Sequence, residues 1–269
     1  MYCLSMNDNH YNLIKKFDYI PVGLGKDNFS SQWLRDNTGK NISQKNKYYG
    51  EYTFHYWIWK NYLDKIDDGW TGFCQYRKFW SLDKINKLPK SIDHLDSLVL
   101  KDIPKEYEDF NVILGEPMFI NKLKVMKFLK RGLKIIIKNP SCLINKDKRN
   151  IKFHFDMWHG QNYLTKAIKL LDRDNREDFT RFVETQCSFN PENMFICKSK
   201  KIIKNYYNSI FPWLKRCEKV FGFKSDSYGK TRIYGFLAER YLSFWFNKYT
   251  KPLTWPIIWF DINDINSKS

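Results

Sequence analysis

Long hydrophobic runs and closely paired cysteines are both absent from this chain. No stretch approaches the roughly 18 consecutive apolar residues of a membrane-spanning helix, and the N-terminal MYCLSMNDNH lacks the basic segment and apolar run of a signal peptide. The 6 cysteines are widely spaced, without a Cys-x-x-Cys pair or the framework of small secreted domains. We therefore expect a protein of the reducing cytoplasm with no integral membrane segment.

Internal repeats, linkers rich in Pro, Gly or Ser, and low-complexity tracts are also lacking, which favours a single domain over residues 1–269. Hydrophobic residues make up 43% of the chain and aromatic residues 18%, which is ample for a substantial core. Tyr and Trp also suit a wall on which a sugar or a base stacks. A/T-rich codon usage explains the same composition equally well.

Acidic residues are scarce beside basic ones. The chain has 46 Lys and Arg against 29 Asp and Glu, a formal net charge of +17. Such an excess points to an anionic partner: nucleic acid, a phosphorylated substrate or an acidic membrane surface. The lysines are spread along the whole chain, whereas nucleic-acid binders concentrate them in an arm or a single helix. We therefore expect no nucleic-acid partner.

Short β-rich runs alternate with longer periodic segments, which predicts an α/β fold. The expected strands are Tyr2 to Met6, Tyr19 to Leu24, Trp70 to Tyr76, Asn111 to Leu114 and Met194 to Cys197. The expected helices are Tyr48 to Lys65, Asn121 to Lys138, Trp158 to Leu171, Arg176 to Thr185, Lys200 to Val220 and Thr231 to Tyr249. In such folds ligands bind beyond the carboxyl ends of the strands, so the residues that follow each strand are the candidates for a site.

The stretch GFCQYRKFW runs an apolar strand directly into Gln75, Tyr76, Arg77 and Lys78. Arg offers bidentate hydrogen bonds to phosphate oxygens and Lys a point charge, so the two together can neutralise a diphosphate as a divalent metal would. A solvated basic turn is the alternative.

The polar loop DNTGKNIS follows the second expected strand. Its side chains surround a glycine that can adopt positive φ, so the loop can hold a base and a ribose, or it can be a capped turn before the next helix. In that helix Glu51 and His55 are spaced to share one face, either as a polar pair at the cleft or as an ordinary surface pair.

Two later segments carry further polar clusters. His154, Asp156 and His159 in HFDMWHG match no standard zinc spacing, and we interpret them as a hydrogen-bonded cleft wall. In RIYGFLAER, Arg232 and Glu239 lie about 20° apart around a helix and share a face. A carboxylate held near a cation can act as a general base, and the same pair can equally be a structural ion pair.

Taken in order, YIPVGLG, DNTGKNIS, YYGEYTFHYWIWKN, GFCQYRKFW, NMFI and RIYGFLAERYL resemble the DUF4422 family of bacterial capsule and O-antigen glycosyltransferases. The motifs span nearly the whole chain. The resemblance implies a single GT-A (Rossmann-like) domain with a mixed central sheet flanked by helices. Residues 1–115 would then form a nucleotide-sugar-binding half and residues 116–269 an acceptor-binding half.

The resemblance also assigns roles by position. The nucleotide-sugar would be bound by Asp36, Asn37, Thr38, Gly39, Asn41, Ser43, Gln75, Tyr76 and Arg232. The catalytic residues would be Arg77, Lys78 and Glu239, and Asn193 and Arg240 would meet the acceptor. We expect the cleft-wall residues His154, Asp156 and His159 to meet the acceptor as well, although the family motifs do not include them. The family's His-Tyr-Arg-Arg motif reads Gln75, Tyr76, Arg77 and Lys78 here, so Gln75 cannot transfer a proton.

The expected reaction is transfer of a hexose or galactofuranose unit from a UDP-sugar to a growing surface polysaccharide, with inversion and with no metal cofactor, although Mn²⁺ or Mg²⁺ stays an open alternative. The acceptor would be a lipid-linked glycan, and the basic surface would hold the protein at the cytoplasmic face of the inner membrane. A non-catalytic carbohydrate-binding protein or a degenerate transferase remains the alternative.

Overall fold

The structure is a computed structural model that describes residues 1–84, 88–122, 136–137, 140–225 and 227–263. Within these residues nine strands form one sheet, in the order β10-β6-β9-β4-β1-β2-β3, with β5 paired to β4 and β11 paired to β5. The strands are β1 (Tyr2–Ser5), β2 (Ile20–Gly23), β3 (Leu34–Arg35), β4 (Thr71–Gln75), β5 (Lys78–Trp80), β6 (Val112–Gly115), β9 (Phe195–Cys197), β10 (Pro252–Trp255) and β11 (Ile257–Trp259). All five expected strands are present.

The sheet is mixed. β1, β2, β3 and β4 run parallel, whereas β9 is antiparallel to both β4 and β6. Thr71 pairs with Cys197 and Gly72 with Ile196, so the residues that precede β9 lie beside the carboxyl end of β4. This reversal brings the start of one strand to the edge of the sheet where the parallel strands end.

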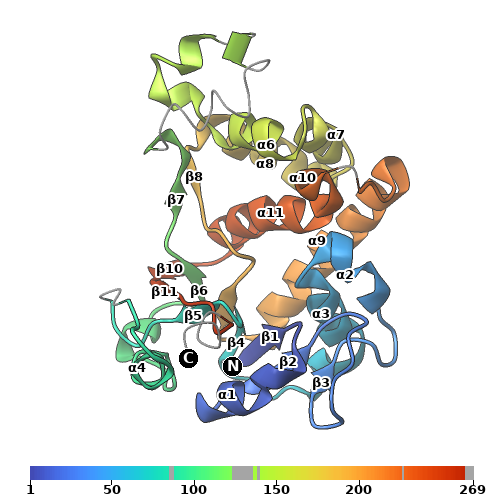
Figure 1. The fold of residues 1–269 in the computed structure, drawn as a ribbon. Helices are drawn as coiled ribbons and strands as arrows, with labels where there is room; N and C mark the ends of the chain where they lie inside the picture. The colour runs from blue at the N-terminus through green and yellow to red at the C-terminus, as the bar shows by residue number, and fades with distance from the viewer. Residues whose placement is uncertain (85–87, 123–135, 138–139, 226, 264–269) are drawn as a thin grey trace.

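Each face of the sheet buries its own hydrophobic core, because successive side chains of a strand point to opposite faces. Leu4 and Phe73 belong to the core on one face, whereas Cys3 and Cys74 belong to the core on the other. Helices α1 (Tyr11–Lys16) and α4 (Ile92–Asp96) cover the second face. The first face is covered by α3 (Tyr52–Trp57), α9 (Lys200–Phe221) and α11 (Ile233–Tyr249) (Figure 1).

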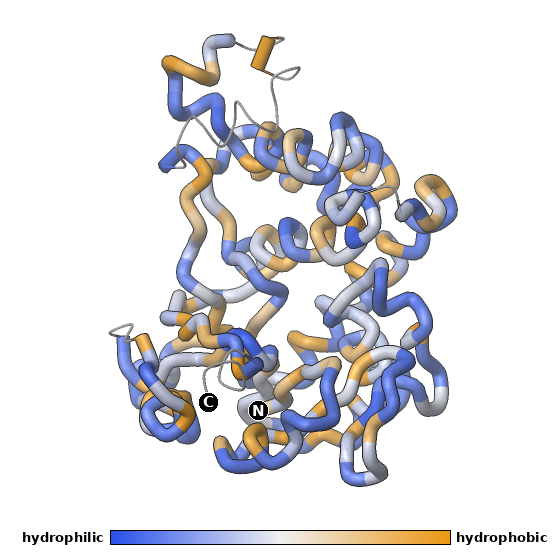
Figure 2. The backbone as a smooth tube through the Cα atoms, viewed as in Figure 1, coloured by the Kyte–Doolittle hydropathy of each residue, from blue (hydrophilic) through white to orange (hydrophobic). Residues whose placement is uncertain are grey.

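A helical layer lies beyond α11. It consists of α6 (Ile151–His159), α7 (Tyr163–Lys169) and α8 (Arg173–Thr185), and the two-stranded ribbon of β7 (Met118–Phe119) and β8 (Ser188–Phe189) leads to it from the sheet. Hydrophobic and hydrophilic residues alternate along these helices (Figure 2), as expected where each buries one side. The mixed α/β sheet with flanking helices confirms the expected fold class.

Two expected helices are interrupted. The segment expected as one helix from Tyr48 to Lys65 is divided at Gly50, which has φ 58°, into α2 (Asn46–Tyr49) and α3, followed by a π-helix (Ile58–Tyr62) and a 3-10 turn (Leu63–Lys65). The segment expected as one helix from Trp158 to Leu171 is divided at Gly160, between α6 and α7. The helix expected over Asn121 to Lys138 lies almost wholly outside the described residues.

Candidate active site

A cavity opens at the carboxyl ends of β1, β2 and β4, where ligands bind in folds of this type. Its volume is about 140 Å³. The lining residues are Leu4, Ser5, Met6, Leu24, Asn46, Gly50, Glu51, Gln75, Tyr76, Arg77, Lys78, Tyr228 and Arg232. The QYRK turn and the residues just before α11 therefore meet at one site.

A second, more open hollow of about 540 Å³ adjoins the cavity, with Met6, Asn46, Tyr228 and Arg232 lining both. Its other walls include Ser43, Lys26 and Lys47. This volume lies within the range of about 300–1,000 Å³ that is typical of small-molecule sites. The two spaces together offer an elongated ligand a narrow end beside the strands and a broader, cationic end.

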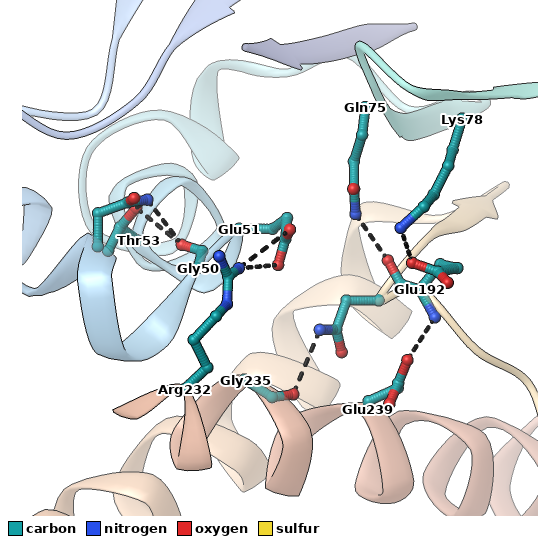
Figure 3. Close-up of polar contacts among 11 residues, drawn as sticks. Gly50, Glu51, Thr53, Gln75, Lys78, Glu192, Arg232, Gly235 and Glu239 are labelled. Carbon is teal, nitrogen blue, oxygen red and sulfur yellow. Dashed lines mark hydrogen bonds and ion pairs between the residues drawn. The ribbon is translucent and has the colours of Figure 1, made fainter. Parts of the chain in front are cut away.

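Arg232 is the cation shared by both spaces, and Gly50 determines where it lies. A Cβ atom on Gly50 would be 2.2 Å from Nη2 of Arg232, so the guanidinium rests directly against this glycine. The same Nη2 lies 3.4 Å from Oε1 of Glu51 (Figure 3). Arg232 and Glu51 are only 25% and 19% exposed, so the pair is largely enclosed by the walls of the cavity.

The turn between β4 and β5 directs its two cations differently. Arg77 is half exposed and pairs with Asp261 at 2.7 Å, with its guanidinium 4.8 Å from the centre of the Tyr76 ring. Lys78 is only 15% exposed and forms an ion pair with the carboxylate of Glu192. Both side chains line the cavity while each already has an anionic partner.

Glu192 is a site residue that the sequence interpretation missed. It belongs to the segment before β9, and its carbonyl oxygen accepts a hydrogen bond from Nε2 of Gln75 at 2.9 Å (Figure 3). Burial raises the pKa of the Glu192 carboxyl to about 7, because Lys78 offsets only part of a desolvation that the carboxylates of Glu239 and Glu51 reinforce. Sequence offered one signal, an acidic residue in a polar turn directly before the NMFI strand.

Glu239 lies on α11 beneath this turn. Its Oε1 accepts the backbone N–H of Glu192 at 2.7 Å, and its Oε2 pairs with Arg240. Arg240 is 2% exposed, and its Nη2 donates to Nδ1 of His154 at 3.2 Å and to Nε2 of His159 at 3.4 Å. Arg232 and Glu239 do not pair with each other. Arg232 pairs with Glu51, and Glu239 pairs with Arg240.

The two histidines form a buried wall around Arg240. Burial and the neighbouring guanidinium lower the pKa of His154 to about 3 and shift that of His159 in the same direction, so both rings are neutral acceptors. Asp156 is directed elsewhere, because its Oδ1 accepts the N–H of Asn162 at the turn between α6 and α7. Nδ2 of Asn193 donates to the carbonyl of Gly235 at 3.2 Å, which joins the segment before β9 to α11.

The DNTGKNIS loop largely satisfies its own hydrogen bonds. The amide of Asn41 donates to the carbonyls of Asn37 and Gly39, and Oγ1 of Thr38 accepts a hydrogen bond from the indole of Trp57 at 2.9 Å. Asp36 is fully buried and accepts the N–H of Gly25. Of the six residues assigned here to nucleotide binding, only Ser43 lines either of the two spaces, and Asp36, Asn37, Thr38, Gly39 and Asn41 surround the turn instead.

The expected pairing of Glu51 with His55 is wrong. α3 begins after Glu51, whose carboxylate points into the cavity, whereas His55 is 1% exposed and its Nδ1 lies 2.7 Å from the hydroxyl of Tyr207. Asp172-Arg173-Asp174 has the spacing of a metal-binding Asp-x-Asp motif, but Asp172 pairs with Arg216 at the surface at 2.9 Å. Among the described residues, no group of three or more His, Cys, Asp or Glu side chains is placed to hold a metal ion.

The architecture is shared with a solved glycosyltransferase. The apo structure of WbbM, described as a bifunctional glycosyltransferase, matches with a TM-score of 0.72 and 20% sequence identity over 96% of this chain. This chain covers 45% of that protein, so it corresponds to less than half of its length. The fold is therefore that of a glycosyltransferase domain.

Residues 3–251 match the family model described as "Domain of unknown function (DUF4422)", and the chain belongs to this family, which confirms the resemblance inferred from its motifs. No curated protein matches the sequence. In the described part of the chain, no helix combines the length and the apolar character needed to span a bilayer.

Proposed function

We propose that this protein is a glycosyltransferase that moves a hexose or galactofuranose unit from a UDP-sugar to a growing bacterial surface polysaccharide. The observation that carries the proposal is a cavity at the carboxyl ends of the parallel strands, lined by Arg77, Lys78 and Arg232, in a fold shared with a glycosyltransferase. We treat residues 1–269 as one domain. Residues 1–115 supply most of the donor side, and residues 116–269 supply the acceptor side.

The donor would lie across the two adjoining spaces, with its diphosphate next to Arg232. Cations in a partly enclosed cavity stabilise the negative charge that develops on a departing diphosphate, which is the part a divalent metal plays in other enzymes. Arg232 and Lys78 face the cavity, and Arg77 lies at its edge. We therefore propose transfer that does not depend on a metal, with a net inversion by direct attack.

The carboxylates Glu51 and Glu192 hold these cations in the absence of donor. A diphosphate carries more charge and more acceptor oxygens than a single carboxylate, so it can compete for Arg232 and Lys78. Donor binding would then release the carboxylate of Glu192 towards the acceptor side. There the acceptor hydroxyl loses its proton to a carboxylate beside the cavity, where the backbone N–H of Glu192 donates to the carboxylate of Glu239.

The acceptor side is bounded by α6 and α11. The buried side chains His154, His159 and Arg240 would shape this wall and hold Glu239, and Asn193 would fix the turn that carries Glu192. Asp156 lies between the two histidines along α6, but its carboxylate caps the turn at Asn162, so it would contact the acceptor only by leaving that turn. The net charge of +17 fits an acceptor presented at an anionic membrane surface.

The test is calorimetric titration of the purified protein with UDP in EDTA and in Mn²⁺, followed by transfer assays with UDP-sugars. We expect saturable UDP binding and transfer that EDTA does not abolish. Arg232→Ala should weaken UDP binding by about 10-fold or more, because a hydrogen bond to a charged group contributes about 1.5–3 kcal/mol. Arg181→Ala, which removes an arginine 73% exposed on α8, is the matched control and should change nothing.

Three results would contradict the proposal. Absence of binding by any nucleoside diphosphate would favour a non-catalytic carbohydrate-binding protein. Binding without transfer of any sugar would indicate a degenerate transferase. A strict requirement for Mn²⁺ would overturn the metal-independent mechanism and leave the transferase assignment standing.

A further inference from the structure

The backbone of the segment before β9 is held in a conformation that residues other than glycine rarely adopt. Glu192 has φ 82° and Asn193 has φ 53°, two consecutive residues with positive φ, and neither of them is a glycine. Such a conformation is unfavourable for a residue with a Cβ atom, and it persists only where the surrounding structure fixes it. Glu192 contacts Gln75 and Lys78, which line the cavity. Backbone strain next to a cavity indicates that the position of the Glu192 side chain matters more for function than the stability of this segment does.

Three hydrogen bonds, one from β4 and two to α11, fix this segment. Gln75, at the end of β4, donates to the carbonyl of Glu192, and Glu239 on α11 accepts the N–H of the same residue. Asn193 donates to the carbonyl of Gly235, also on α11. Both polar groups of the Glu192 peptide backbone are thus held, which directs its side chain to Lys78 at the cavity (Figure 3).

The carboxylates around the site differ in what they already bind. Glu239 is 13% exposed, and its two oxygens are engaged by the Glu192 N–H and by the buried guanidinium of Arg240. Glu51 lies on the donor side and pairs with Arg232. Glu192 is 18% exposed, and its partner is Lys78, a cavity residue that a diphosphate can draw away.

We propose that Glu192 is the general base of the transfer reaction and that Glu239 is a positioning residue, which orients Glu192 through its backbone N–H. This inference rests on the proposed function and reassigns the catalytic role that the sequence suggested for Glu239. Once a diphosphate draws Lys78 away, the ionised carboxylate of Glu192 can approach an acceptor hydroxyl, whereas Glu239 would first have to give up one of its two hydrogen bonds.

The step balances without a further reactant. The acceptor oxygen forms a bond to the anomeric carbon of the donor sugar, and its proton passes to the carboxylate of Glu192. The bond between that carbon and the β-phosphate oxygen breaks, and UDP leaves with the electron pair, where Lys78 and Arg232 meet its charge. The proton then returns to solvent from Glu192.

The electrostatic surroundings suit a base that works near neutral pH. The charged groups facing Glu192 are Lys78 from β5, Glu239 and Arg240 from α11, and Glu51 from the turn before α3. Burial, with the two carboxylates against the ammonium, raises the pKa of Glu192 to about 7. The activity of the free enzyme should therefore rise with pH through about 7, as the carboxyl loses its proton.

The test compares Glu192→Gln with Glu239→Gln in transfer and UDP-binding assays. Glu192→Gln should lower kcat by about 100-fold or more, the usual contribution of a general base, while UDP affinity changes by less than about 3-fold. It should also remove the rise of kcat/KM through pH 7. Glu239→Gln can still accept the N–H of Glu192, so we expect a smaller loss and an unchanged pH profile, whereas Glu239→Ala should lose more.

Two further variants keep the test decisive. Glu192→Asp retains the charge that Lys78 requires and so should fold, but it withdraws the carboxylate by one methylene and should lower kcat by about 10-fold or more. Glu184→Gln removes a glutamate that pairs with Lys152 at the surface and should match the wild type.

A Glu192→Gln variant that keeps more than a third of wild-type kcat would overturn the assignment, and so would a Glu239→Gln variant that alone loses the pH-dependent rise. In both cases the wild type still binds UDP and transfers sugar, so the proposed function survives. A wild type that binds UDP with no transfer from any nucleotide sugar, or that binds no nucleotide, would overturn the proposed function and the base together.

Discussion

Gly50 offers a perturbation that separates backbone strain from the placement of Arg232. Gly50 has φ 58° and ψ −135°, a region that residues with a Cβ avoid, and its Cβ position lies 2.2 Å from Nη2 of Arg232. In Gly50→Ala the backbone must bear the strain, and the guanidinium must move out of the cavity. The flexible arginine can do so without unfolding the chain.

Gly222 is a matched control for the backbone term. It has φ 61° and ψ −158°, and a Cβ there would meet nothing within 4 Å. Each alanine variant should therefore lose about 1–3 kcal/mol of unfolding free energy. The displaced ion pair of Arg232 with Glu51 is partly solvated, so it should add no more than about 1 kcal/mol in Gly50→Ala.

Donor binding should distinguish the two variants far more clearly than stability does. If Arg232 contacts the diphosphate, Gly50→Ala should bind UDP about 10-fold or more weakly, since a charge-assisted hydrogen bond is lost, and Gly222→Ala should bind it as the wild type does. Urea unfolding and calorimetric titration measure the two quantities. Equal UDP affinities would refute a donor role for Arg232 at this position, and an unchanged stability in Gly222→Ala would refute the backbone reasoning.

Two further predictions concern the buried charges. Burial lowers the pKa of both His55 and His154 to about 3, below the usual 6.5. Between these two pH values the unfolded chain binds more protons than the folded protein, so the stability decreases as the pH is lowered. At pH 5 each histidine should withdraw about 2 kcal/mol, a loss measurable by urea unfolding at pH 7.5 and 5; equal stability at both values would contradict the neutral, buried rings. Arg240→Met should destabilise the fold by about 3–5 kcal/mol, because it leaves Glu239 enclosed without its cation. A smaller loss in the same urea unfolding assay would show that solvent reaches the pair.

The sequence by itself determined the fold class and one wall of the cavity. Apolar runs followed by polar turns identified the strands, and the rule that ligands bind beyond strand ends directed attention to Gln75, Tyr76, Arg77 and Lys78, all of which line the cavity. Helical periodicity placed Arg232 and Glu239 on one face of one segment. These are local properties, so the chain's own order of residues is enough to predict them.

Only the tertiary structure decided which charges meet. The sequence cannot show that β9 runs antiparallel to β4, and that reversal brings Glu192 beside Lys78 from more than a hundred positions away along the chain. Nor can periodicity show that α3 begins after Glu51, because the break depends on the positive φ of Gly50 against Arg232. Ion pairs depend on distances of a few ångström across separate elements, and strand direction and helix ends set those distances.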